Sequence, residues 1–374
     1  MSDTLVIGVD ASRAISARPT GTEVYSQRLI DSLLTQAPSH HFRLYFRSSP
    51  PAGTFPGAEL RPIPLPRLWT HLRLSWEMAL HSPDLLFVPA HVLPLIHPPL
   101  SLVTVHDLGY LHFPHAHPLL QRIYLDLSTR WNARAAAHIL ADSEATRSDL
   151  IARYRTPPEK VTVAYPGYDE ALAPAREPGV IAEVKARYGV VGDYFLHIGT
   201  LQPRKNLSQL ITALSSPELE DLFPKPTLVL AGRRGWLYEN LFAQVRRLGL
   251  EDRVLFPGYV HDADKAALLS GALAFLFPSL YEGFGLPVLE AQACGCPVIC
   301  SATSSLPEVA GEAALLVDPL DTDAWTAAMA RLASDSNLRT ELVKRGYVNL
   351  QRFSWRCCAQ TVLEVMESLV ASQR

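Results

Sequence analysis

Short apolar runs alternate with longer amphipathic patterns along the whole chain. In the first half, the strand candidates are TLVIGVDA, FRLYFR, DLLFVPA, SLVTVHD, HILADS and KVTVAYPG. The second half restarts the same rhythm with DYFLHIGT and continues through PTLVLAG, RVLFPGYV, LAFLFPS, PVICS and AALLVDP. Buried strands that alternate with helices are typical of parallel βαβ units. The pattern therefore predicts an α/β protein built from doubly wound, Rossmann-like sheets.

One segment interrupts this rhythm near residues 170 to 192. It is polar, contains Pro and Gly, and has no strand pattern. A chain of 374 residues is also too long for one ordinary core, since domains usually hold about 100 to 200 residues. We therefore expect a first domain at 1–170, a linker at 171–192 and a second domain at 193–350. A terminal amphipathic helix at 351–374 can pack on either domain, including back on the first.

The composition narrows the class of protein. With 34 basic and 37 acidic residues the net charge is -3, which argues against a protein that binds nucleic acid by general phosphate attraction. No apolar run reaches the roughly 18 residues that span a bilayer. The N-terminus, MSDTLVIGVDASRA, has no basic segment and passes into a strand, so we expect no secretory signal. The five cysteines are interpreted as buried free thiols in a reducing, cytoplasmic compartment.

Basic residues stand at the end of the first strand of the second half, in HIGTLQPRKNLSQL. Open α/β sheets bind ligands at the carboxyl ends of their strands. Asn206, with Gln209 three residues later, resembles a helix N-cap, so a helix is predicted to begin near Leu207. Arg204 and Lys205 then precede a helix N-terminus, where the helix dipole favours anions. An anion such as phosphate would explain the pair, and the alternative is two solvated residues on a loop.

A second strand end, LAFLFPSLYEGFGLPVLEAQAC, combines glycines with carboxylates. Gly283 and Gly285 allow a positive φ and a close approach of the backbone to a ligand. Glu290 lies in the following helix, and its side chain leans toward the helix N-terminus and so toward Glu282. Carboxylates accept hydrogen bonds from sugar hydroxyls, whereas phosphate would bind the free amides and the basic pair. Each glutamate also has a non-functional explanation when considered alone. Glu290 would interact favourably with the helix dipole in the first turn, and Glu282 would be an exposed charge on a loop.

The first half offers two further candidates. His106 and Asp107 follow the strand of SLVTVHD, where a histidine can donate to a hydroxyl or can be a buried, satisfied side chain. Gly21 and Thr22 precede a helix, in a turn that could face phosphate. The segment PRLWTHLRLSWEMAL mixes arginines with tryptophans, which fits helix packing or contact with a membrane surface.

Other chemistries have less support. Asp262 and Asp264 form a D-x-D pair, but acids at a helix start are explained by the helix dipole, and no metal site is expected. The sequence has no G-x-G-x-x-G fingerprint after its first strand and no G-x-x-x-x-G-K-[ST] loop. Hydride transfer and ATP hydrolysis therefore lose their usual sequence signature.

Taken together, these motifs resemble the family 4 glycosyltransferases of the GT-B fold. Residues 282–287, with Glu290 closing an E-x7-E spacing, carry the resemblance. GTLQPRKNL, PGYV, FPSLYEGFGLPVLEAQACGCPVI and LPEVAGEAALLVDP match that family in order and spacing. The likeness covers essentially all of the second domain and more loosely the first. It implies two doubly wound domains facing a central cleft, and a retaining transferase that uses a nucleotide-diphosphate sugar.

The resemblance also implies a role for individual residues. In that family the first glutamate of the motif contacts the donor sugar, here Glu282, and the second holds the ribose, here Glu290. Lys205 with Arg204 would stabilise the leaving diphosphate, as a metal does in other folds, so neither metal nor cofactor is expected. His106 would lie beside the transferred sugar. The remaining donor contacts implied are Gly21, Thr200, Tyr259, Val260, Gly283, Phe284, Gly285 and Leu286.

Two positions depart from the family pattern. Many relatives have an arginine directly after the final glycine of the strand, where this sequence has Thr200 after Gly199, and Arg204 is the candidate to supply that charge. The N-terminal loop has one glycine, Gly21, instead of a glycine-rich run. Tyr259 and Val260 would lie near the base.

The style of GTLQPRKNL resembles bacterial mannosyltransferases and favours GDP-mannose as donor, with UDP-sugars still open. The acceptor implied is a glycan or a lipid-linked glycan in polysaccharide biosynthesis, and a lipid-linked acceptor would bring a peripheral contact with the inner membrane face. No nucleic-acid partner is expected. Two alternatives are a sugar-nucleotide epimerase of similar fold and a non-catalytic sugar-nucleotide-binding protein. Retention in the family is ascribed to front-face attack, in which the departing phosphate takes the acceptor proton.

Overall fold

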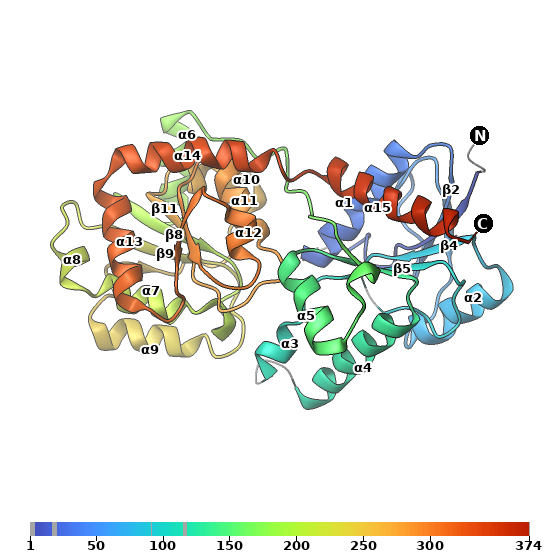
Figure 1. Ribbon diagram of the computed structural model, residues 1–374. Helices are drawn as coiled ribbons and strands as arrows, with labels where there is room; N and C mark the ends of the chain where they lie inside the picture. The colour runs from blue at the N-terminus through green and yellow to red at the C-terminus, as the bar shows by residue number, and fades with distance from the viewer. Residues whose placement is uncertain (1–3, 17–20, 91, 115–117, 374) are drawn as a thin grey trace. The chain divides into compact units, whose positions relative to one another are not determined.

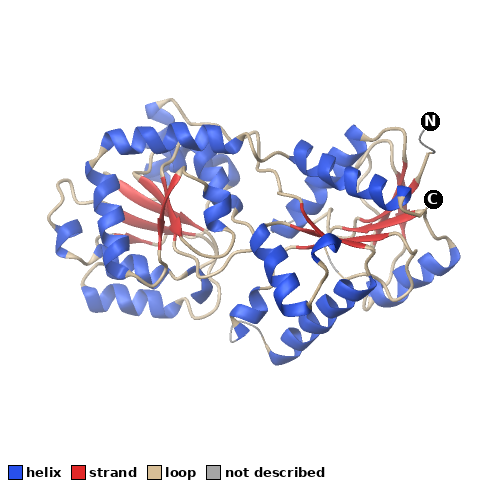
Figure 2. Ribbon diagram, in the orientation of Figure 1, coloured by secondary structure: helices blue, strands red, loops and turns tan. Residues whose placement is uncertain are grey.

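The computed structural model describes residues 4–16, 21–90, 92–114 and 118–373 as two compact units. The first unit contains residues 1–167 and 353–374, and the second contains 168–352. The chain thus leaves the first unit after Gly167 and returns to it at Phe353. In each unit the strands form a central sheet with helices on both sides (Figures 1 and 2).

The first unit is built on a parallel sheet of order β3-β2-β1-β4-β5-β6-β7. Its strands are β1 (Val6–Asp10), β2 (His41–Phe46), β3 (Glu59–Pro62), β4 (Leu85–Val88), β5 (Ser101–Val105), β6 (His138–Ala141) and β7 (Val161–Val163). Its helices are α1 (Gly21–Gln36), the π-helix η1 (Trp69–Leu74), α2 (Ser75–Leu80), α3 (Gly109–His112), α4 (Leu119–Ala135), α5 (Glu144–Tyr154), the 3-10 helix η3 (Pro158–Lys160) and α15 (Trp355–Ala371).

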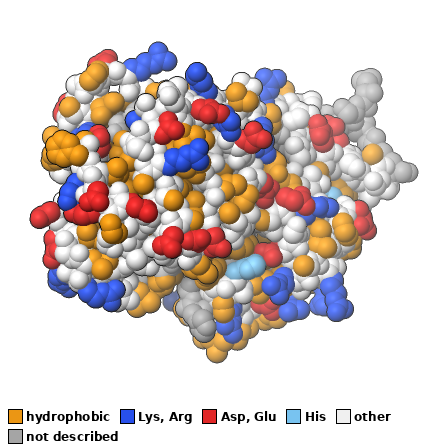
Figure 3. All heavy atoms as spheres, turned by 60° about the vertical axis from the view of Figure 1, so that its left-hand side comes forward, with side chains coloured by type: hydrophobic (Ala, Val, Ile, Leu, Met, Phe, Trp, Pro, Cys, Tyr) orange, Lys and Arg blue, Asp and Glu red, His pale blue; other side chains and the backbone are white. Residues whose placement is uncertain are grey.

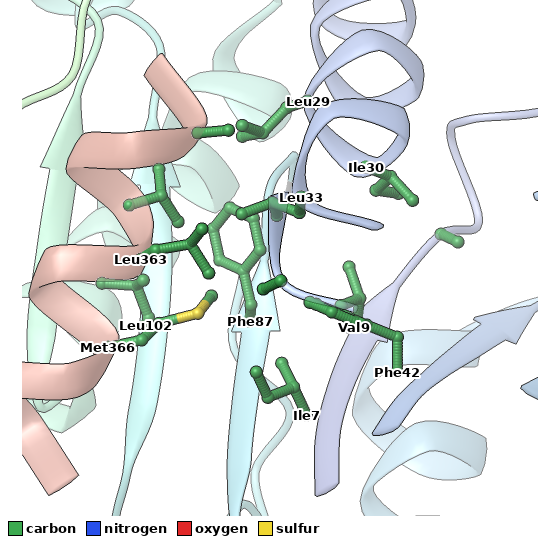
Figure 4. Packing of buried hydrophobic residues seen from close by; sticks show 14 of the residues in the cluster. Ile7, Val9, Leu29, Ile30, Leu33, Phe42, Phe87, Leu102, Leu363 and Met366 are labelled. Atoms are coloured by element: carbon green, nitrogen blue, oxygen red, sulfur yellow. The ribbon is translucent and has the colours of Figure 1, made fainter. Parts of the chain in front are cut away.

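Two apolar layers cover this sheet. On one face α1 and α15 pack together over the strands, so that Leu29 and Leu33 of α1 meet Leu363 and Met366 of α15 above Phe87 (Figure 4). On the other face η1, α2, α4 and α5 enclose a second cluster around Trp69, Leu86 and Leu150. The terminal helix α15 is therefore part of the core of the first unit.

The second unit repeats the arrangement with the parallel order β10-β9-β8-β11-β12-β13. Its strands are β8 (Tyr194–Ile198), β9 (Thr227–Ala231), β10 (Val254–Leu255), β11 (Ala274–Phe277), β12 (Val298–Ser301) and β13 (Ala314–Val317). Its helices are α6 (Pro178–Arg187), the 3-10 helix η4 (Pro203–Lys205), α7 (Leu207–Leu214), α8 (Pro217–Glu220), α9 (Glu239–Leu248), α10 (Asp262–Ser270), α11 (Leu286–Ala293), α12 (Leu306–Ala310), α13 (Thr322–Ser334) and α14 (Ser336–Leu350).

Local chemistry explains where several helices begin. Ser143, Asp321, Asp335 and Ser354 each precede a helix, and each side chain accepts a hydrogen bond from the backbone amide three residues later. Such caps satisfy one of the amides that a helix start leaves without an intrahelical partner. The predicted α/β, doubly wound architecture is confirmed, and every strand predicted from the apolar runs is present.

The structure differs from the sequence-based expectations in several places. The expected linker 171–192 contains α6, and Arg187 of α6 donates to Asp264 of α10 across 2.6 Å, so this segment packs on the second unit. The strand β3 was not expected, because ELRP is polar and ends in proline, which is tolerated at a sheet edge. Cys357 is exposed, whereas the other four cysteines are buried free thiols as predicted.

Candidate active site

The strand order of the second unit places two loops side by side. β8 and β11 are neighbours at the point where the sheet order reverses, and ligands of doubly wound sheets bind outside the carboxyl ends of strands at such a point. The loop after β8 carries Thr200 and the basic pair of η4. The loop after β11 carries Glu282. The backbone joins the two loops, because the amide of Leu280 donates to the carbonyl of Arg204 across 2.9 Å.

Three charged side chains meet between these loops. Lys205 Nζ donates to Glu282 Oε1 across 2.6 Å, and Arg204 Nη1 lies 3.0 Å from Glu282 Oε2. Arg204 also donates to the carbonyl of Tyr281. Lys205 Nζ lies 4.6 Å from the ring centroid of Phe277, at the end of β11. The structure thus brings together three of the predicted catalytic residues, and each carboxylate oxygen of Glu282 faces a different cation.

This arrangement keeps Glu282 ionised. Burial alone would raise its pKa, but Lys205 and Arg204 outweigh burial and hold the pKa at about 2. Backbone contacts fix the same residue, since its amide donates to Ser304 Oγ and Ser305 Oγ donates to its carbonyl. A rigid, charged carboxylate of this kind accepts hydrogen bonds and is not suited to donate a proton at neutral pH.

The motif glycines shape the start of α11. Gly285 precedes the helix with a φ of 118°, a conformation that residues with a side chain rarely adopt. A Cβ atom there would lie 2.8 Å from Leu306. Phe284 is buried, Gly283 and Leu286 are half-buried, and Ser305 Oγ donates to the carbonyl of Phe284 across 2.6 Å. The turn is therefore held from α12 as well as from β11.

Glu290 is held by a residue that the sequence analysis missed. Lys265 of α10 donates to Glu290 Oε1 across 3.2 Å, and both side chains are partly exposed. Burial would lower the pKa of Lys265, but the charge of Glu290 outweighs it, so the pKa of Lys265 is raised. Glu290 and Glu282 are thus anchored by separate cations. No motif in the sequence connects α10 with α11, so only a three-dimensional structure shows this pair.

A cation and an aromatic ring meet at the ends of β9 and β10. The guanidinium carbon of Arg233 lies 5.0 Å from the ring centroid of Tyr259, which is about half exposed, whereas the adjacent Val260 is buried. Tyr259 also meets His261 edge to face at 5.6 Å. A flat, partly exposed ring with a guanidinium beside it offers stacking and hydrogen bonding to a planar group. Arg233 was not predicted, although its place two residues after the end of β9 was the available signal.

Backbones approach each other closely near Thr200, which is exposed. A Cβ on Gly232 would lie 1.8 Å from the carbonyl oxygen of Gly199, and one on Gly235 would lie 2.5 Å from that of Leu201. Glycine is therefore required at both positions to let the loops after β8 and β9 run side by side. Asn206 behaves differently from the prediction: it has a φ of 54° and its side chain donates to the carbonyl of Pro319, so it does not cap α7.

His197, at the end of β8, adds a buried neutral group. Its Nδ1 lies 2.9 Å from the carbonyl of Leu276, while its Nε2 is buried and has no hydrogen-bond partner among the described residues. Burial lowers the pKa of His197 to about 4. A neutral ring with Nδ1 protonated leaves Nε2 as an acceptor directly beneath Gly199, 3.0 Å from the point where a Cβ would lie.

The remaining candidates belong to the first unit. His106 follows β5, and both of its ring nitrogens are engaged: Nδ1 lies 2.7 Å from Asp142 Oδ2 and Nε2 lies 2.9 Å from the carbonyl of Pro89. Burial would lower the pKa of His106, but Asp142 outweighs it and the pKa is raised. Gly21 is exposed and is the first residue of α1. Residues 17–20 of the predicted phosphate-facing turn lie outside the described residues.

Other surface features do not form a competing site. Asp264 of the D-x-D pair is bound by Arg187 and Tyr188, whereas the side chain of Asp262 is exposed. Within the described ranges no cluster of three or more His, Cys, Asp or Glu side chains could hold a metal ion. A surface hollow before α13 is lined mainly by acids, of which Asp321 caps α13, and such a lining repels phosphate.

Sequence models of known families match both units. Residues 20–172 match the model described as Glycosyltransferase Family 4, and residues 191–349 match the model described as Glycosyl transferases group 1. The chain is 36% identical to O-antigen chain mannosyltransferase B of Escherichia coli over 264 residues, which is 70% of this chain and 69% of that protein. It is 32% identical to an MMP alpha-(1->4)-mannosyltransferase of Mycolicibacterium hassiacum, over 68% of this chain and 60% of that protein.

Solved structures show the same fold at low sequence identity. Sucrose-phosphate synthase of Thermosynechococcus elongatus superposes with a TM-score of 0.76 at 21% identity, over 98% of this chain and all of that one. WaaG, a glycosyltransferase involved in lipopolysaccharide biosynthesis, superposes with a TM-score of 0.71 at 17% identity, over 97% of this chain and 99% of that one. These similarities confirm the predicted GT-B fold of two Rossmann-like domains.

Proposed function

Since the chain belongs to the family 4 glycosyltransferases, we propose that it transfers a sugar, with retention of configuration, from a nucleotide-diphosphate donor to a glycan or lipid-linked acceptor. GDP-mannose is the donor we favour, because several relatives at 32–36% identity are named mannosyltransferases. The pathway we propose is polysaccharide biosynthesis on the cytoplasmic side of the membrane. One observation carries the proposal: Arg204 and Lys205 converge on Glu282 at the switch point of the sheet.

The chemistry we assign to this cluster is electrostatic. The bond between the sugar C1 and the β-phosphate oxygen breaks, and a bond forms from C1 to the acceptor oxygen on the same face. The departing phosphate oxygen takes the acceptor proton. Lys205 and Arg204 would stabilise the negative charge that develops on the leaving diphosphate, so we propose that no metal ion is needed. Glu282 would accept hydrogen bonds from the donor sugar, a role that suits a carboxylate with a pKa of about 2.

The remaining assignments follow the resemblance and the local geometry. We propose that Glu290, oriented by Lys265, holds the ribose hydroxyls, and that Tyr259 with Val260 lies against the base. The amides of the glycine turn before α11 would face the diphosphate. His106 and Gly21 stay predictions as contacts to the sugar and the diphosphate. Because both nitrogens of His106 are already engaged, we propose that it acts through its charge.

The first test is a thermal-shift screen against GDP, UDP, ADP and their sugar conjugates, with and without EDTA. A ligand that binds only the folded state adds about 2.7 kcal/mol of stability at a hundredfold excess over its dissociation constant. A shift with one base that persists in EDTA and is lost in Glu290→Ala would identify the donor nucleotide. The anomeric configuration of the product, measured by NMR, then tests retention. Absence of any shift in folded protein would contradict the proposal.

The two alternatives give different results in the same assays. An epimerase would convert GDP-mannose or another donor without an acceptor, whereas a non-catalytic binding protein would show the shift and no turnover. Glu282 and Glu290 each form an ion pair with a lysine. These retained charges favour a working transferase site over a degenerate one.

A further inference from the structure

The large hydrophobic side chains that the first unit leaves exposed are concentrated in one stretch of the chain. Among the described residues of that unit there are eleven of them, and all fall between residues 68 and 127. The exposed hydrophobic side chains of the second unit are scattered along its length, and the face that Figure 3 brings forward intersperses apolar, acidic and basic groups. Single exposed apolar residues are ordinary, whereas a continuous group marks an interaction surface.

One part of the group is a stripe along η1 and α2. Its members recur every fourth residue: Leu68, which directly precedes η1, and then Leu72, Trp76 and Leu80 within the two helices. Residues four apart lie on the same side of a helix. Leu68 and Trp76 are 64% and 62% exposed. The opposite side of the same segment is buried in the core through Trp69, Leu74 and Met78. The segment therefore has two apolar sides. One packs in the core and the other faces outward.

The other part lies on the first turns of α4. The exposed apolar residues there are Leu119, Leu120, Ile123, Tyr124 and Leu127, a spacing that forms one helix face. Leu120 is 81% exposed. The buried residues of α4 come later, at Thr129, Asn132 and Ala133, so the C-terminal half of the helix anchors it.

The two parts are neighbours and form one surface. His71 of η1 lies 3.2 Å from the hydroxyl of Tyr124 on α4, and their rings meet edge to face at 6.1 Å. Leu95 and Ile96 are also exposed. They lie next to the start of α2, because the amide of Leu95 donates to Ser75 Oγ across 2.9 Å. We call the exposed apolar residues of 68–80, 95–96 and 119–127 the α2–α4 surface.

Positive charge accompanies this surface. Arg67 is exposed, Arg122 is half-buried on α4, and the guanidinium of Arg47 lies over the ring of Trp69 at 5.4 Å. The acidic residues of the two segments are already paired: Glu77 is buried against Arg61 and Arg73, and Asp126 is bound by Arg130.

We propose that the α2–α4 surface docks on an anionic phospholipid bilayer. Outward leucines, a tryptophan and a tyrosine, with arginines beside them, are the chemistry that inserts into the headgroup region of such a bilayer. The long arginine side chains can place their charges at the phosphates while their stems lie on apolar surface. A symmetric contact with a second copy is disfavoured, since it would bring Arg67 and Arg122 of one copy, which form no ion pair with a described residue, toward those of the other.

The proposal gives the proposed transferase a location for a lipid-linked acceptor, and in that sense it rests on the proposed function. The docking itself uses neither donor nor acceptor. Vesicle binding and nucleotide binding are therefore measured separately, and one can fail while the other holds.

The experiment is flotation of the full chain with vesicles of phosphatidylglycerol and phosphatidylethanolamine, and with phosphatidylcholine vesicles for comparison. The protein should float with the anionic vesicles, and the bound fraction should fall as salt rises from about 0.1 M to about 1 M. The double variant Trp76→Ser/Leu120→Ser should lose about tenfold in vesicle affinity, and Arg67→Glu/Arg122→Glu should lose anionic selectivity. Leu320→Ser, at a 74% exposed leucine of the second unit, is the matched control and should bind as the parent does.

All variants alter exposed or half-buried positions, and an unchanged melting temperature confirms that they fold. The nucleotide-induced thermal shift should persist in each of them. Failure of the parent protein to float with anionic vesicles would overturn the proposal, as would equal binding by the Trp76→Ser/Leu120→Ser variant. Light scattering that shows a dimer of the parent and a monomer of that variant would assign the surface to a second copy instead.

Discussion

Lys205 and Glu282 are 77 positions apart in the sequence, and Lys205 Nζ donates to Glu282 Oε1 across 2.6 Å. Each side chain is 11% exposed. The pair forms because β8 and β11 are adjacent, so the loop after each strand opens at the same edge of the sheet. A buried ion pair costs desolvation of both charges, and hydrogen bonds must offset that cost. Here Arg204 supplies a second cation to the same carboxylate, which fixes the position of Glu282.

The low pKa of Glu282 predicts a pH-dependent contribution to stability. The pKa is about 2 in the folded protein and 4.5 for an ordinary glutamate, so the carboxylate stabilises the fold above pH 4.5 and loses this effect as the pH falls toward 2. We expect Glu282→Gln to lower the free energy of unfolding by about 3 kcal/mol at pH 7, and by about half of that at pH 3. Urea unfolding at both pH values measures the difference.

The matched control for that experiment is Glu341→Gln. Glu341 forms an ion pair with Arg345 on the surface of α14, with its side chain 54% exposed. Its removal should change the free energy of unfolding by less than about 1 kcal/mol. If Glu282→Gln behaves like this control at pH 7, then Glu282 is not held as an ionised group by the basic pair.

Removal of the Lys205 charge should affect the chemical step most strongly. If Lys205 stabilises the leaving diphosphate, Lys205→Ala should lower kcat by about 10²–10³, the range found when one group that stabilises transition-state charge is removed. Single-turnover rates with saturating donor measure this. The exposed Lys225, which pairs with Glu220, offers the control Lys225→Ala, for which kcat should be unchanged. Near-full turnover by Lys205→Ala would refute the assigned role.

The sequence predicts the architecture better than the interactions within the site. The strand pattern and the restart of the rhythm at residue 193 depend on local periodicity, which can be recognised in a sequence. The helix does begin at Leu207, although the Asn206 cap from which its start was predicted does not form. The edge strand β3 is missed because ELRP has no apolar alternation and little to bury. In the same way α6 is missed because its buried contact is one side chain, Val184, together with polar bonds to α10.

Partners that come from distant segments could not be predicted. Lys265 with Glu290, and Arg233 with Tyr259, join loops and helices whose proximity depends on the register of the sheet. Asn206 shows the converse case. Its sequence context fits an N-cap, but its backbone adopts a positive φ and its side chain donates to the carbonyl of Pro319 instead. A long-range hydrogen bond here outweighs a local preference worth only about 1 kcal/mol.

The ion pair of His106 in the first unit predicts a titration above the usual range. Burial would lower the pKa of His106, but Asp142 outweighs it, so the pKa lies above 6.5. The imidazolium therefore stabilises the fold below pH 6.5, and this contribution is lost as the pH rises through the folded-state value. In ring-detected NMR, a histidine resonance should titrate late, above pH 6.5, and His106→Gln should remove that resonance.

Asp142→Asn separates the two influences on His106. Without the carboxylate, burial is the dominant effect, and the pKa of His106 should fall below 6.5. His112, which pairs with Asp149 on the surface, supplies the comparison, since Asp149→Asn should leave the late-titrating resonance in place. An unchanged late titration in Asp142→Asn would contradict the assignment.

Lys265 is predicted to act as a positioning residue for Glu290. Lys265→Met keeps the length of the side chain but removes the bond to Glu290. If Glu290 binds the ribose, the variant should raise KM for the donor about tenfold, equivalent to about 1.4 kcal/mol, with kcat little changed. Lys265→Arg should restore part of the affinity. A fall in kcat with constant KM would instead place Lys265 at the reacting atoms.

The close approach of the loops after β8 and β9 can be tested at Gly232. Its φ is 145°, and a Cβ there would lie 1.8 Å from the carbonyl oxygen of Gly199, so Gly232→Ala must displace one of the two loops. We expect a loss of about 3 kcal/mol or more in the free energy of unfolding, from strain and overpacking together. The displacement should also weaken nucleotide binding, because Arg233 follows directly.

The control variant is Gly179→Ala, in α6, where the space around the added methyl is open. It should be neutral or stabilise by up to about 1 kcal/mol. Equal stability of the two variants would show that the backbones are not in contact.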